Sequence, residues 1–154
     1  MIIQAISLEI IQFVNDLDKI KYKFAGFKSP DDKWLYLIEL SKQSVPIDPD
    51  LKRDQFVVDG CSTVLFLVPS YDDGKLYFDM DLGTRRLPSI SLGLALLLKK
   101  VYSGMTPKEI LAFDTNFFNE IGLNVGMTPT RANGFASMLK LIRRYADVFS
   151  KMSD

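Results

Sequence analysis

The segment that decides the fold runs from residue 55 to residue 80 and has the sequence QFVVDGCSTVLFLVPSYDDGKLYFDM. Gln55–Val58 is short and β-branched, Thr63–Val68 is strongly apolar, and Lys75–Met80 alternates between polar and apolar residues. Each of these three runs predicts a strand. Asp73-Gly74, between the second and third runs, is a strong signal for a hairpin turn. The segment therefore predicts a three-stranded antiparallel sheet.

Two helices are expected before this sheet. Ser7–Leu17 places apolar residues on one side, as in an amphipathic helix. Ser29 followed by a proline and two aspartates predicts the start of a second helix, Asp31–Lys42. The apolar residues that this helix would direct toward the core are Trp34, Leu35 and Ile38, with Leu37 as a further candidate. Two prolines in Val45–Pro49 then predict an extended connection.

Helical patterns also fill the chain after the sheet. Ser89–Tyr102 is apolar nearly all round, which is typical of a buried central helix. Thr106–Glu109 has the pattern of a capping box, and Asn116–Ile121 predicts another short helix. Thr128–Arg131 opens a last helix with apolar residues at helical spacing. The order of elements predicts an α+β fold: N-terminal helices, the sheet, then C-terminal helices packed on one face of it.

Size and composition limit the classes of function. The 154 residues fit one domain, residues 1–154. Lysine plus arginine and aspartate plus glutamate both number 19, whereas a general nucleic-acid binder would carry a basic excess. The longest apolar run, Leu92–Leu98, is too short to span a membrane. A single cysteine cannot form an internal disulfide, so we expect a cytoplasmic protein.

The absence of histidine restricts the chemistry further. Without histidine the chain cannot form a Ser-His or Cys-His pair for acyl transfer. One thiolate and no imidazole cannot complete a zinc site or hold an iron–sulfur cluster within one chain. A carboxylate-bound metal stays possible, but the sequence has no spaced aspartate motif of the EF-hand type, so we expect no metal site, and any thiol chemistry must use Cys61.

Cys61 follows Gly60 in a tight connection between two expected strands. A glycine there permits backbone angles that other residues rarely adopt. Loops on a rigid scaffold often carry function, but a lone cytosolic cysteine is often a small buried apolar residue. The residues alone leave both interpretations open.

Arg131 is the second candidate for a functional residue. It lies in the first turn of a capped helix, where the helix dipole disfavours a cation. This mismatch indicates a carboxylate or a partner protein as the reason for the arginine; an exposed, solvated arginine is the alternative. Asp79 and Asp81 could be mistaken for paired catalytic carboxylates, but nothing in their setting predicts a raised pKa, and a structural role is favoured.

Several short motifs follow one another in a fixed order between Trp34 and Tyr145. They are Tyr36–Lys42, Val58–Thr63 around Cys61, Lys75–Phe78, Met105–Ile110 and, most specific, Met127-Thr128-Pro129-Thr130-Arg131-Ala132-Asn133-Gly134-Phe135. In this order and at these separations, the chain resembles the SufE family, the sulfur acceptors that serve cysteine desulfurases in iron–sulfur cluster assembly. The resemblance covers most of the chain.

The resemblance implies a SufE/NifU-like fold and a function. Cys61 would take sulfane sulfur from a SufS-like, pyridoxal-phosphate-dependent cysteine desulfurase as a persulfide and pass it to a SufBCD-like scaffold. Gly60 and Arg131 would support the cysteine or contact the partner. The pyridoxal phosphate belongs to the desulfurase, so no cofactor is implied here. Whether the chain forms a homodimer stays open.

The chain departs from the family pattern in two places. Ser62 and Val64 replace polar residues that usually follow the cysteine, and Arg85–Leu92 with Gly93 differs from the segment that usually precedes the central helix. We expect both places to lie where a desulfurase docks. The departures favour an alternative function, a non-catalytic SufE-fold adaptor that regulates a desulfurase or binds another protein.

Overall fold

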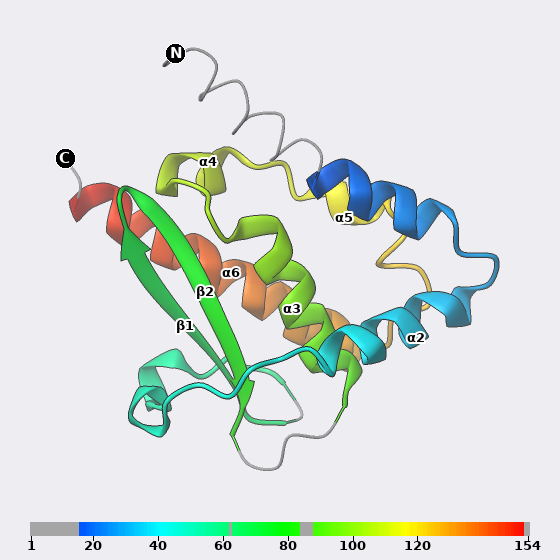
Figure 1. Ribbon diagram of the computed structural model, residues 1–154, viewed down its shortest axis with the longest axis horizontal. Coiled ribbons are helices and arrows are strands. Elements are labelled where there is room, and N and C mark those ends of the chain that lie inside the picture. Colours follow the sequence, from blue (N-terminus) through cyan, green and yellow to red (C-terminus); the bar gives the residue numbers. More distant parts are fainter. Residues whose placement is uncertain (1–15, 62, 84–87, 153–154) are drawn as a thin grey trace.

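The computed structural model describes residues 16–61, 63–83 and 88–152. In these residues, helices pack against one antiparallel hairpin in an α+β fold (Figure 1), which confirms the predicted class. Residues 16–25 form the first described helix. The other elements are α2 (Pro30–Ser41), two 3₁₀ turns (Pro49–Leu51 and Asp54–Phe56), β1 (Leu65–Asp72), β2 (Lys75–Leu82), α3 (Ile90–Tyr102), α4 (Pro107–Ala112), α5 (Asn116–Glu120) and α6 (Pro129–Met152).

The predicted hairpin is present. β1 and β2 pair antiparallel, and the pairing ends with Asp72 opposite Lys75. Between them, Asp73 and Gly74 have φ angles of 51° and 79°, as a two-residue turn of the tight hairpin type requires. Along β2, three buried residues alternate with two exposed ones: Leu76, Phe78 and Met80 are buried, Tyr77 and Asp79 exposed. One face of the hairpin is therefore covered, by α3 and α6.

The strand predicted over Gln55–Val58 is wrong. Asp54–Phe56 forms a 3₁₀ turn, and the sheet has two strands among the described residues. In the described residues this segment meets β1 through a bridge, Val57 opposite Phe66, in which the Val58 N–H donates to the Leu65 carbonyl at 2.9 Å. The chain turns sharply on both sides of this contact, at the 3₁₀ turn and at Gly60, so only two residues run beside the sheet.

α3 is the centre of the core. Nine of its residues are buried, and Ser89 caps its start by accepting a hydrogen bond from Leu92 N–H at 3.0 Å. α2 crosses it closely at Gly93, where an added Cβ would lie 2.1 Å from the Leu37 carbonyl oxygen. On the hairpin side, the Tyr145 hydroxyl of α6 donates to the Leu67 carbonyl of β1 at 2.9 Å. The predicted buried central helix is confirmed.

The helix starts are close to those predicted, but the buried side of α2 differs. Ser29, Thr106 and Thr128 stand at the expected helix starts. In α2, Leu37 and Leu40 are buried, whereas Leu35 is 60% exposed, so its predicted place in the core is wrong. α2 contacts α3 on the side that carries Leu37. Leu35, two residues earlier, lies on the opposite side of the helix. The helix predicted over Ser7–Leu17 lies mostly outside the described residues.

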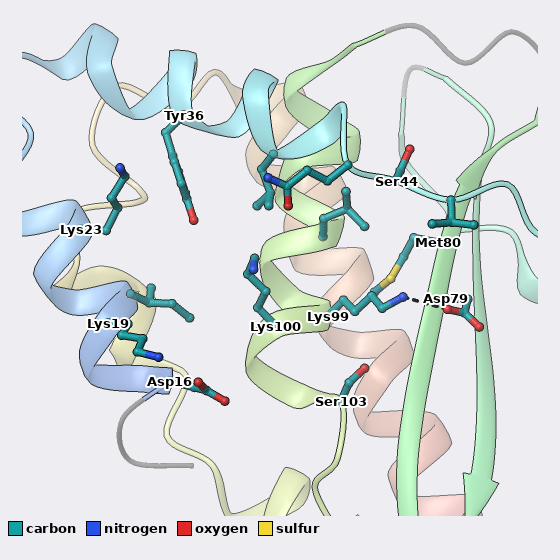
Figure 2. Close-up of a pocket in the computed structure, with 15 residues that line it drawn as sticks. Asp16, Lys19, Lys23, Tyr36, Ser44, Asp79, Met80, Lys99, Lys100 and Ser103 are labelled. Atoms are coloured by element: carbon teal, nitrogen blue, oxygen red, sulfur yellow. Dashed lines mark hydrogen bonds and ion pairs between the residues drawn. The ribbon is translucent and has the colours of Figure 1, made fainter. Parts of the chain in front are cut away.

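An open groove of about 670 Å³ lies between the helix 16–25, α2, α3 and β2 (Figure 2). A second, smaller cavity contains Cys61. Of the helices in the described part of the chain, none is both long and apolar enough to cross a membrane.

Candidate functional site

Cys61 is presented by a glycine bend that is fixed to the sheet. Gly60 has a φ angle of +82°, in the left-handed region that favours glycine, which bears out the expected bend. Val58, two residues earlier, is buried and bonded to β1, so the bend starts from a rigid point. Ser137 of α6 lies beside it, because a Cβ added to Gly60 would be 3.4 Å from the Ser137 hydroxyl oxygen.

The sulfur of Cys61 lies against α6. A Cβ added to buried Gly134 would be only 3.0 Å from the Cys61 sulfur, so the missing side chain at residue 134 makes room for the thiol. Cys61 itself is half-buried. It shares a cavity of about 360 Å³ with seven other residues, namely Ser91, Leu94, Thr128, Thr130, Arg131, Gly134 and Met138.

The cavity therefore brings together the two predicted candidates, Cys61 and Arg131, which are seventy positions apart in the chain. Arg131 comes from the first turn of α6, where its backbone N–H approaches the Thr128 hydroxyl at 3.4 Å. The start of a 24-residue helix thus forms part of the cavity wall. The positive end of the helix dipole and the Arg131 charge both favour an anion there.

Burial has the opposite effect on the resting thiol. Loss of water around Cys61 raises the pKa of its thiol, because the low-dielectric surroundings disfavour the thiolate. The thiol is consequently protonated at neutral pH. A cysteine held in this way is weakly nucleophilic until something changes its surroundings.

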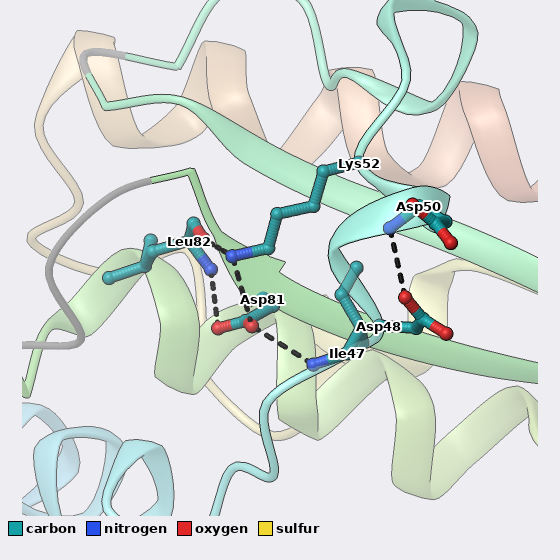
Figure 3. A network of polar contacts seen from close by, with 6 residues as sticks. All are labelled: Ile47, Asp48, Asp50, Lys52, Asp81 and Leu82. Atoms are coloured by element: carbon teal, nitrogen blue, oxygen red, sulfur yellow. Dashed lines mark hydrogen bonds and ion pairs between the residues drawn. The ribbon is translucent and has the colours of Figure 1, made fainter.

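The connection that leads toward Cys61 is fixed by a buried carboxylate (Figure 3). Asp81, at the end of β2, is fully buried and accepts hydrogen bonds from the backbone N–H groups of Ile47 (3.0 Å) and Leu82 (2.9 Å). Lys52 completes the group: its amine lies 3.4 Å from the carboxylate and donates to the Leu82 carbonyl at 2.9 Å. Asp81 therefore binds the connection to the sheet. Asp79 forms a separate ion pair with Lys99, 2.8 Å.

Lys33 is a residue that the sequence reasoning missed. Its side chain is buried, and its amine donates to the carbonyls of Gly122 (2.9 Å), Leu123 (3.4 Å) and Val125. The amine also lies 4.4 Å from the centre of the Trp34 ring. The lysine thereby fixes the loop that precedes α6 and its arginine. The signal that singled out Arg131, a cation near a helix start, applies equally to Lys33 in α2.

The departures from the family pattern fall in different surroundings. Val64 is exposed (53%) at the surface just before β1. Leu92 and Gly93, by contrast, are buried in α3. They do not lie on a docking surface, contrary to the expectation from the sequence. Gly93 is instead required by the crossing with α2. Ser62 and Arg85–Leu87 lie outside the described residues.

Among the described residues, no group of three or more histidine, cysteine, aspartate or glutamate side chains is arranged to hold a metal ion. The reactive groups of the cavity are the thiol, two threonine hydroxyls, a serine hydroxyl and a guanidinium. Fold and cavity together define a single-thiol α+β domain, with the thiol between a glycine bend and the start of a long helix.

Comparison of the chain with known proteins shows the family to which it belongs. Residues 18–146 match the model of the SufE Fe-S metabolism associated domain. The chain is 29% identical over 134 residues to an uncharacterized SufE-like protein of Synechocystis sp., covering 87% of this chain and 82% of that protein. The chain belongs to the SufE family, as its motifs predicted, and the family links it to iron–sulfur metabolism.

The fold also has a counterpart among solved structures. The solution structure of a hypothetical protein from Thermus thermophilus superposes with a TM-score of 0.69. The match covers 86% of this chain and 93% of that chain at 20% sequence identity. This likeness supports the fold.

Proposed function

We propose that Cys61 accepts sulfane sulfur from a cysteine desulfurase as a persulfide and delivers it to an iron–sulfur cluster scaffold of the SufBCD kind. The observation that carries the proposal is the position of the Cys61 sulfur, half-buried in a cavity shared with Arg131 and the start of α6. A carrier must shield its cargo from water and still expose it to a partner. A half-buried thiol at a loop bend meets both needs.

The transfer is a thiol–disulfide-type exchange and requires no external oxidant or reductant. The Cys61 thiolate attacks the outer sulfur of a persulfide on the desulfurase. A new S–S bond forms at Cys61, the S–S bond on the desulfurase breaks, and the electron pair leaves with the desulfurase cysteine thiolate. The proton of the Cys61 thiol passes to solvent or to the partner. Delivery to a scaffold thiolate repeats the same exchange in the other direction.

The surroundings of the sulfur suit the product better than the resting thiol. A persulfide is a stronger acid than a thiol, so at a given pH a larger fraction of the loaded form carries a negative charge. That charge would lie in the cavity with the Arg131 guanidinium and the positive end of α6, both of which stabilise an anion. The resting thiol, in contrast, is kept protonated by burial. The proposal therefore needs the docked partner to increase the thiolate fraction of Cys61.

Intact-protein mass spectrometry tests the proposal. The chain is incubated with a cysteine desulfurase and cysteine, and we expect Cys61 to gain the mass of one sulfur atom that dithiothreitol removes. Cys61→Ser should fold and gain nothing, while Arg131→Gln should gain sulfur more slowly. Lys140→Gln, on the same helix and exposed, is the matched control and should behave as the wild type. Sulfur on the Cys61→Ser variant would overturn the proposal.

A second function, a non-catalytic adaptor, is favoured by one observation. Val64 exposes an apolar side chain where the family usually has a polar residue, close to Cys61 in sequence. An adaptor would bind a desulfurase without accepting sulfur. Complex formation in a pull-down with an unmodified Cys61 mass would support the adaptor and contradict the carrier.

A further inference from the structure

The groove of about 670 Å³ is a separate site from the Cys61 cavity. Leu94 of α3 lines the cavity of Cys61, whereas Leu96 lines the groove. Two residues along a helix are about 200° apart around its axis, so the two sites lie on opposite sides of α3. Small-molecule sites commonly have volumes of roughly 300–1,000 Å³, and the groove is within this range.

The lining of the groove includes an aliphatic surface. It consists of side chains from all four surrounding elements and the connection after α2: Ile20, Leu40, Val45, Met80 and Leu96. The aromatic residue of the lining, Tyr36, is already in contact with Phe24 (ring centres 5.5 Å apart, edge-on) and with the Lys23 amine (5.6 Å). The groove therefore offers contacts to a flexible aliphatic chain more than a platform for a flat ring.

Four lysines border this aliphatic surface, namely Lys19, Lys23, Lys99 and Lys100. Lys99 forms its ion pair with Asp79, and Asp16, the other acidic residue of the lining, also takes part in an interaction. Lys19 and Lys100 have no ion-pair partner among the residues that the structure describes. Lys19 belongs to the helix 16–25 and Lys100 to α3, which form facing walls of the groove (Figure 2).

We propose that the groove binds a fatty acid, with the carboxylate between Lys19 and Lys100 and the hydrocarbon chain on the aliphatic surface. A small inorganic anion would use the amines and leave the apolar surface in water. A neutral hydrocarbon would gain nothing from the two exposed amines. A carboxylate with an aliphatic chain satisfies both parts of the lining.

Titration calorimetry with the full chain tests the proposal. Octanoate, decanoate and dodecanoate are the probes, each below its micelle concentration. Each added methylene that enters the groove should lower Kd by about fourfold. Acetate, which has the head but no chain, should show no binding. Dodecyl maltoside, which has the chain but no charge, should bind at least tenfold more weakly than dodecanoate, roughly the value of one charged hydrogen bond.

Two variants locate the site. The double variant Lys19→Gln/Lys100→Gln should raise the Kd for dodecanoate at least tenfold, because losing even one charged contact weakens binding by about that factor. Val45→Asp places a carboxylate in the aliphatic lining at an exposed position (73%), so it should weaken binding without disturbing the core. The matched control is Lys108→Gln/Lys140→Gln, two exposed lysines outside the groove, which should leave Kd unchanged.

Three results would overturn the proposal. They are no binding of dodecanoate by the wild type, equal binding by the groove variants and the control, and equal binding of dodecanoate and dodecyl maltoside. The inference is independent of sulfur transfer, because Cys61 does not line the groove. Persulfide formation on Lys19→Gln/Lys100→Gln, measured by mass, should match the wild type, so failure of one proposal leaves the other standing.

Discussion

At the scale of single residues, the contact between Cys61 and Gly134 determines how exposed the thiol is. The sulfur reaches α6 because residue 134 has no side chain, and the bend at Gly60 points it there. Neither glycine has a reactive side chain, yet both set the burial on which the thiol pKa depends. Reactivity of this cysteine is thus controlled by backbone shape more than by a neighbouring base.

Gly134→Ala should uncover the thiol. The added Cβ would lie 3.0 Å from the Cys61 sulfur, so the bend must move away from α6. Alanine is favoured over glycine within a helix by about 1 kcal/mol, which offsets the strain, and we expect the free energy of unfolding to change by less than about 1 kcal/mol. The rate of alkylation by iodoacetamide should rise several-fold.

Asn133→Ala is the matched control for this substitution. Asn133 is the exposed neighbour of Gly134 in the same helix, and it does not line the Cys61 cavity. Its alkylation rate should equal that of the wild type. An unchanged rate in Gly134→Ala, with an unchanged unfolding curve, would show that the sulfur does not lie against residue 134.

The pH dependence of alkylation should reveal the buried thiol. Burial raises the pKa of Cys61, so the folded chain holds this proton more tightly than the unfolded chain. The alkylation rate, which follows the thiolate fraction, should therefore rise at higher pH in the native protein than in urea. By the same linkage, the free energy of unfolding should fall as pH rises through this range. A native midpoint at or below the urea midpoint would contradict the burial.

At the scale of elements, α6 is positioned by a contact in its C-terminal half and by a contact on the loop that precedes it. The Tyr145 hydroxyl bonds it to β1, and burial raises the Tyr145 pKa to about 12, so this donor keeps its proton at physiological pH. Before the helix begins, Lys33 of α2 holds the loop 122–125 through three carbonyls. The start of α6, which carries Arg131, depends on this lysine for its position.

Lys33→Met should destabilise the fold without removing a reactive group. Methionine retains the length and the apolar contacts, but the carbonyls of Gly122, Leu123 and Val125 lose their donor. We expect the free energy of unfolding in urea to fall by about 1–3 kcal/mol, the usual cost of buried groups left unpaired. Lys42→Met, which removes only an exposed ion pair with Glu39, should cost less than about 1 kcal/mol. Equal losses of unfolding free energy in the two variants would contradict the role of Lys33 in holding the loop 122–125.

Local signals in the sequence predict most elements, because each depends on residues close in the chain. The caps at Ser29 and Thr106 and the turn at Asp73-Gly74 require only neighbouring atoms, and the sequence predicts them. Gln55–Val58 was predicted as a strand because two adjacent valines favour extended backbone. Its actual path depends on the turns around it, which a short run cannot reveal.

At the scale of the whole molecule, both cavities are formed by residues distant in sequence. The Cys61 site could be predicted in part, since the thiol, its glycine and Arg131 each carry a local signal. That they share one cavity, and that Gly134 makes room for the sulfur, depends on how α6 packs beside the bend. The groove is even less accessible to sequence reasoning, because its lining spans residues 16 to 103 and four elements.

Because Cys61 is the single cysteine of the sequence, it also allows site-specific labelling. No other residue among the 154 bears sulfhydryl chemistry, so a maleimide dye or nitroxide would attach at one known position without any mutagenesis. The attached dye or nitroxide would report, through fluorescence or electron spin resonance, on the surroundings where α6 begins. Real-time observation of a partner arriving at that position thus requires nothing but the natural polypeptide.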